Sequence, residues 1–111
     1  MDKESQEVMF LHFVFSLQNA VMIQLGKIAN PMTGEIEKDL AQAKATIDML
    51  EMLKEKTKGN LSEHETKVLN NILTQLQLNY VDELDKERNK EKREGNKEGK
   101  EKKSEKNKQE T

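Results

Sequence analysis

The chain has 111 residues, with 19 Lys or Arg and 21 Asp or Glu, so its formal net charge is −2. This length allows one domain with a small core. Because the chain contains no cysteine, disulfides and thiolate metal sites are excluded, and the composition fits a reducing cytoplasm. Self-association is then the remaining way to stabilise a small core.

Apolar residues and charges are divided unevenly along the chain. No apolar side chain follows Leu84, and residues 85–111 hold 11 bases and 8 acids, which leaves residues 1–84 with a net charge of −5. A segment without apolar side chains cannot bury enough surface to offset the entropy lost on ordering. We therefore predict an all-α domain in residues 1–84 and a disordered tail in residues 85–111, mobile beyond about Glu94.

The first predicted helix begins between Lys3 and Glu7 and ends near Ile28, where Asn30-Pro31 removes a backbone donor. At 100° per residue its apolar side chains cover most of the circumference. The broad face that we expect to pack on the core holds Phe10, Phe13, Val14, Leu17, Val21, Leu25 and Ile28. A second apolar face holds Val8, Leu11, Phe15 and Met22, beside a narrow polar strip that contains Ser5, His12, Ser16, Asn19 and Gly26.

This helix does not have the pattern of a transmembrane span or of a signal peptide. His12, Ser16 and Asn19 interrupt its apolar run, which is barely long enough to cross a bilayer. A signal peptide begins with basic residues, whereas the residues before Val8 are net acidic. We expect no transmembrane span and a cytoplasmic protein.

Two further helices are predicted after a turn at residues 30–35. The second helix is capped by Asp39 and ends at residues 56–58, where Gly59 supplies a left-handed conformation. The third begins with a capping box formed by Ser62 and Glu65. The expected buried residues are Leu40, Ala43, Ile47, Leu50 and Leu53 in the second helix and Val68, Leu69, Ile72, Leu73, Leu76 and Tyr80 in the third. The link between them is short, which predicts an antiparallel hairpin.

No residue pattern indicates catalysis, a cofactor or a metal. His64 has no ligand set among its helical neighbours, and His12 lies on the polar strip, where it is either solvated or part of a seam between two helices. The turns around Gly34 and Gly59 lack the spacing of a phosphate-binding loop. We therefore predict no enzymatic activity.

The Lys-rich segment at residues 85–111 leaves alternatives open. It is either a solubilising or weakly interacting tail, an extension without a role, or a nucleic-acid-binding arm of an accessory protein. Its charges alternate in sign and it has no aromatic side chain to stack on bases. We therefore do not expect nucleic acid as a partner.

Several motifs resemble those of one protein family. They are the apolar first helix, the turn Pro31-x-Thr33-Gly34-Glu35, the run Ile47-Asp48-x-Leu50-Glu51-x-Leu53-x-x-Lys56-Thr57-x-Gly59-Asn60-Leu61, and Tyr80-Val81. On these residues the segment from Val8 to Val81 resembles the bacterial domain of unknown function eighteen-forty-four. The resemblance implies a small bacterial helical domain and no particular activity. The motif residues Thr33, Gly34, Glu35, Thr57, Gly59 and Asn60 fit turns and caps, or a shared surface.

The second apolar face of the first helix carries the functional prediction. The two other helices can cover only one side of the first helix. If the protein is a monomer, the second face, Val8, Leu11, Phe15 and Met22, is therefore left in water. We therefore expect a non-enzymatic protein that acts by self-association and protein–protein interaction, as a homodimer or a dimer of dimers. Leu11 and Phe15 are the expected central contacts, bordered by His12, Ser16 and Asn19. The sequence does not name any further protein partner.

Overall fold

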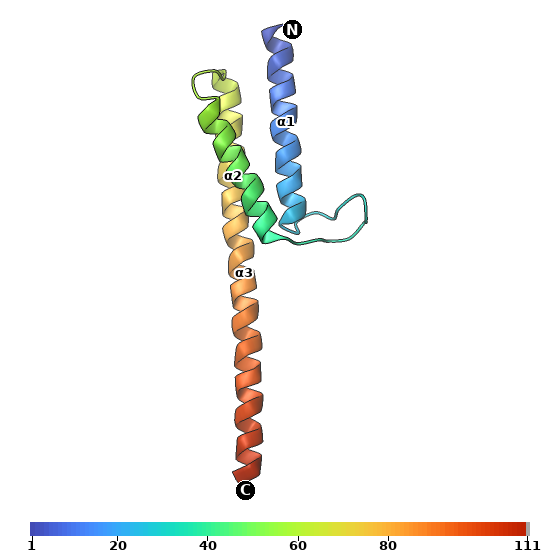
Figure 1. The fold of residues 1–111 in the computed structure, drawn as a ribbon, viewed down its shortest axis with the longest axis vertical. Helices are drawn as coiled ribbons and strands as arrows, with labels where there is room; N and C mark the ends of the chain where they lie inside the picture. The colour runs from blue at the N-terminus through green and yellow to red at the C-terminus, as the bar shows by residue number, and fades with distance from the viewer. Residues whose placement is uncertain (111) are drawn as a thin grey trace. The chain divides into compact units, whose positions relative to one another are not determined.

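The computed structural model describes the backbone of residues 1–110 and the side chains of residues 1–95. It contains three helices, α1 (Lys3–Gln24), α2 (Leu40–Lys56) and α3 (Glu63–Glu110), and no strand among the described residues (Figure 1). The predicted all-α, three-helix class is confirmed. The chain forms two compact units, Met1–Val81 and Asp82–Thr111, which are described separately.

Local hydrogen bonds decide where α1 begins and ends. The Asp2 carboxylate accepts a bond of 2.7 Å from the Ser5 amide at the N-terminus, which lowers the pKa of that carboxyl. At the other end Gly26 has a φ of +78°. The amides of Gly26 and Lys27 donate to the carbonyls of Ile23 and Met22 at 3.0 and 2.9 Å, which closes the helix. The prediction that α1 runs to about Ile28 and is ended by Asn30-Pro31 was therefore wrong.

The capping residues of α2 and α3 are those that the sequence predicts. Asp39 Oδ1 accepts from the Gln42 amide at 3.1 Å, and Gly59 adopts a φ of +86° after α2. In the capping box, the Glu65 amide donates to Ser62 Oγ at 3.1 Å and the Ser62 amide donates to Glu65 Oε1 at 2.8 Å. These local predictions, and the antiparallel hairpin of α2 and α3, are confirmed (Figure 1).

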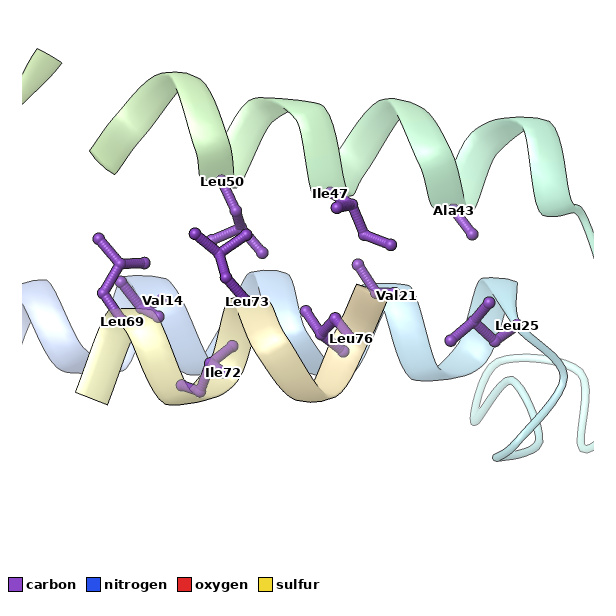
Figure 2. Packing of buried hydrophobic residues seen from close by; sticks show 10 residues of the cluster. All are labelled: Val14, Val21, Leu25, Ala43, Ile47, Leu50, Leu69, Ile72, Leu73 and Leu76. Carbon is purple, nitrogen blue, oxygen red and sulfur yellow. The ribbon is translucent and has the colours of Figure 1, made fainter. Parts of the chain in front are cut away.

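The core of the first unit lies where the three helices meet (Figure 2). Its buried side chains are Val14 and Val21 from α1, Leu25 directly after α1, Ala43, Ile47 and Leu50 from α2, and Leu69, Ile72, Leu73 and Leu76 from α3. Polar contacts at the helix surfaces join the same elements. Thr46 Oγ1 donates to Gln24 Oε1 at 2.9 Å, and Ser62 Oγ donates to Glu7 Oε1 at 2.8 Å. An amide of Gln77 donates to Glu51, which links α3 to α2.

The core-facing side of α1 differs from the predicted one. Val14 and Val21 point into the core, with Leu17 and Met22 packed on either flank. Phe13 is turned about 100° away from Val14 and is mainly exposed, so its assignment to the core was wrong. Ile28, also assigned to that face, lies beyond the end of α1 and is exposed.

In the second unit α3 continues beyond Leu84, through the residues where the sequence predicted a disordered tail to begin. Lys86 Nζ lies 3.3 Å from Asp82 Oδ2 and 3.4 Å from Glu83 Oε1, one helical turn away. Pairs at this spacing stabilise a helix by a few tenths of a kcal/mol each. The predicted mobility beyond Glu94 concerns residues that lie almost entirely outside the described side chains, and it stays a prediction, as does the division at residue 84.

Candidate interaction surface

Four large apolar side chains are exposed on α1. The exposed fractions are 53% for Val8, 58% for Met9, 52% for Phe13 and 44% for Phe15. These residues occupy about two turns of the helix. We call them the exposed α1 cluster. At 100° per residue, Val8 and Phe15 lie on one flank of the outer side of α1 and Met9 and Phe13 on the other. Both flanks point away from the core, so folding of the single chain leaves all four side chains in contact with solvent.

The predicted self-association residues are only partly on this surface. Val8 and Phe15 are exposed, and Leu11 is partly buried. Met22 packs against the chain's own core. Met9 was not among the residues predicted to be exposed, and Phe13 was predicted to face the core. Their spacing of four residues puts them on one helix face and is the signal that would have identified both.

The predicted polar strip runs between the two flanks of the exposed α1 cluster. His12, Ser16 and Asn19 are exposed. Ser16 Oγ donates to the Phe13 carbonyl at 2.7 Å, so this hydroxyl is satisfied within its own helix. Ala20 follows Ser16 by four residues but is partly buried, and it lines a hollow together with Lys38 of the loop and Gln42 of α2.

The loop between α1 and α2 is organised around Asn30. The Asn30 carbonyl accepts from the Gly34 amide at 2.7 Å, and the Asn30 amide donates to the Glu35 carbonyl at 2.8 Å. Asn30 Oδ1 accepts from the Met32 amide at 2.9 Å. The Glu35 amide also donates to Thr33 Oγ1, at 3.3 Å. The motif residues Thr33, Gly34 and Glu35 thus build a closed turn.

The second motif turn closes the α2–α3 hairpin. Thr57 Oγ1 donates to the Leu53 carbonyl at 2.7 Å, and the Asn60 amide donates to the Thr57 carbonyl at 2.8 Å. Together with Gly59, these residues fit the role of a helix cap that the sequence indicated. The turn lies near the start of α1, whereas the Asn30 loop follows the end of α1 (Figure 1). The two motif turns are not brought together within one chain.

The described residues contain no group of three His, Cys, Asp or Glu side chains that could hold a metal ion. His12 and His64 are both exposed.

Within the described part of the chain, no helix has the length and apolar character needed to cross a membrane. On α2 the pKa of Lys44 is raised by its hydrogen bond of 3.1 Å to Asp48, a surface pair of the kind that supports a helix.

The sequence model of the family described as Domain of unknown function (DUF1844) matches residues 7–82. The chain belongs to this family. The match includes most of α1, the Asn30 loop, α2 and the first part of α3, and therefore both motif turns. No curated protein and no solved structure matches the chain. The resemblance inferred from the sequence motifs is confirmed, and it assigns no activity.

Proposed function

We propose that the protein is a non-enzymatic interaction protein that binds a second copy of itself through the outer face of α1. The observation that carries this proposal is the exposed α1 cluster, Val8, Met9, Phe13 and Phe15. Exposed apolar side chains that are grouped along one helix and bordered by polar residues are typical of contact surfaces. A surface that pairs with its own copy about a two-fold axis is the commonest arrangement of protein oligomers.

The energy of apolar burial supports the proposal, and the charge argues against a nucleic acid as the partner. Covering the exposed half of each large side chain stabilises a complex by ~1 kcal/mol, because full burial contributes about 1.5–3 kcal/mol. Residues 1–84, which hold this surface, have a net charge of −5 and would repel a nucleic acid. The lack of cysteine fits a reducing compartment, so the proposal places the protein in the cytoplasm.

A charge placed within the exposed α1 cluster tests the proposal on the full chain. Sedimentation velocity at micromolar concentration should show a dimer for the unmodified protein and a monomer for Phe15→Glu. Leu78→Glu is the matched control, because Leu78 is 67% exposed but lies on α3. It should remain a dimer.

Circular dichroism of each variant separates dissociation from unfolding. If Phe15→Glu fails to fold, Met9→Glu replaces it, since Met9 is the most exposed member of the cluster. If the folded Met9→Glu and Phe15→Glu variants both remain dimers, the outer side of α1 is excluded as the contact.

A further inference from the structure

A hollow lies at the closed end of the α2–α3 hairpin, lined by residues from the last turn of α2, the connecting turn and the first two turns of α3. Its volume of about 300 Å³ is at the lower end of the range for small-molecule sites. Leu61 and the fully buried Leu69 are its apolar lining side chains. It is more enclosed than the neighbouring hollow farther along the hairpin, and we call it the hairpin hollow.

Asn70 brings an unpaired polar atom to the hairpin hollow. Its Oδ1 is buried and has no hydrogen-bond partner among the described residues. Two neighbouring hydroxyl groups are engaged elsewhere, since Thr66 Oγ1 donates to the Ser62 carbonyl at 2.9 Å and Thr74 Oγ1 donates to the Asn70 carbonyl at 3.0 Å. Buried acceptors are normally paired with a protein group, an ordered water or a ligand. Asn70 Oδ1 therefore requires a donor, a hydroxyl or an N–H group, that enters the hollow.

The charged side chains around the hairpin hollow favour an acidic ligand. Lys54 and Lys58 both line it and are exposed, and neither forms an ion pair with another described residue. Glu55 is the one acid in the lining, so two lysines and one glutamate give a net charge of +1. A carboxylate is attracted to such a site, whereas a cation is repelled by the two lysines.

The turn at Gly59 leaves the hairpin hollow accessible. A Cβ placed on Gly59 would meet no atom within 4 Å, so the backbone of the turn borders open space. Gly59 and Leu61 also belong to the sequence run by which the chain resembles its family. The proposed self-association through α1 makes no use of this part of the motif.

We propose that the hairpin hollow binds a small organic acid that carries an apolar body and a hydroxyl group. The hydroxyl donates to Asn70 Oδ1, and the apolar body contacts Leu61 and Leu69. The carboxylate pairs with Lys54 and Lys58 at the rim. The volume of about 300 Å³ fits a single ring or a short chain. This binding is independent of the proposed self-association, because none of these residues belongs to α1.

Titration with benzoates that differ in one hydroxyl group tests the proposal on the full chain. The probes are 3-hydroxybenzoate and 4-hydroxybenzoate, and benzoate, which lacks the hydroxyl, is the reference. Proton–nitrogen NMR spectra should show shifts of the Gly59, Leu61 and Asn70 amides. At least one hydroxybenzoate should bind about three- to tenfold more tightly than benzoate, the ratio expected for one additional hydrogen bond.

Variants assign the two polar contacts. Asn70→Leu removes the acceptor at nearly the same side-chain size, so hydroxybenzoate and benzoate should then bind equally. Asn71→Leu is the matched control, because Asn71 is the exposed neighbour on α3, and it should preserve the difference between the two acids. Lys58→Gln should weaken the binding of all the probes, with or without the hydroxyl.

Three outcomes would overturn the proposal. The first is the absence of shifts at Gly59, Leu61 and Asn70 with every probe at millimolar concentration. The second is equal binding of all probes to the unmodified protein, which would show that a water or Lys54 satisfies Asn70 Oδ1. The third is a difference between the acids that persists in Asn70→Leu. Because the second outcome is measured on the unmodified protein, the proposal is tested even if Asn70→Leu does not fold.

Discussion

The α2–α3 hairpin and α1 use apolar residues in different ways. Each helix of the hairpin directs one apolar stripe to the core, with Leu50 and Leu76 among the fully buried side chains. α1 also buries such a stripe, but it exposes two phenylalanines on its other side. The exposed apolar residues of the hairpin, such as Met52 and Leu78, are divided between two helices. The fold of one chain thus accounts for most of the hairpin sequence, whereas it leaves the outer side of α1 without a contact.

The largest effect is expected in the core that the hairpin shares with α1. Leu50→Ala removes a fully buried side chain and should destabilise the protein by about 2–5 kcal/mol. Thermal or chemical unfolding measures this change. The loss should be similar for Leu50→Ala introduced into Phe15→Glu, because it arises within one chain. A loss below about 1 kcal/mol would mean that the three helices are not packed as described.

The next effect concerns the turn that closes the hairpin. Gly59 holds a φ of +86°, a conformation that a β-branched side chain adopts at high cost. Gly59→Val should therefore lower the free energy of unfolding by about 1–2 kcal/mol without changing the oligomeric state. Urea denaturation provides the measurement. An unchanged midpoint would show that α2 ends in another way.

A smaller effect distinguishes the loop between α1 and α2 from the hairpin. Met32→Ser removes a side chain that is 91% exposed in the single chain, so the monomer should lose no stability. If the loop covers a second copy, dimerisation should weaken roughly five- to tenfold, which corresponds to about 1 kcal/mol. Met52→Ser on α2 is the matched control. Equal dissociation constants for the two variants would argue against a role for the loop.

The smallest effect is a dependence of α1 on pH. Hydrogen bonding to Ser5 lowers the pKa of Asp2 below its usual value of 3.8. A carboxyl with a lowered pKa stabilises the folded state above its usual pKa, and this contribution is lost as the pH falls through the lowered value. Asp2→Asn keeps a capping residue and should remove this dependence. Amide resonances of Lys3 to Ser5, followed by NMR between pH 5 and 2, would reveal it, and identical titrations in both proteins would contradict it.

Helix caps and turns are the features that could be predicted from the sequence. The caps at Asp39 and Ser62 and the turn at Gly59 depend on residues a few positions apart, so local chemistry was sufficient. The end of α1 was misplaced because Pro31 is a strong stop signal, although Gly26 closes the helix before the chain reaches it. The sequence pattern placed Gly26 in the polar strip and gave no indication that it ends the helix.

The candidate site was less predictable than the fold. A helix that is apolar around most of its circumference does not indicate which side faces its own chain. Phe13 was therefore predicted in the core but is exposed, and Met22 was predicted on the surface but packs against the core. The conformation of the loop between α1 and α2 depends on the hydrogen bond between Asp39 and Gln24 and on the several hydrogen bonds of Asn30. No periodic pattern encodes these contacts, so the sequence predicted only a turn at residues 30–35.

The mass of the full chain in solution tests the central claim most directly. Light scattering coupled to size-exclusion chromatography, at several micromolar concentrations, gives this mass independently of shape. Self-association through α1 predicts twice the chain mass of 12.9 kDa, or a higher even multiple, with a fall toward the chain mass on dilution. A folded protein that has the mass of a single chain at every concentration would contradict it.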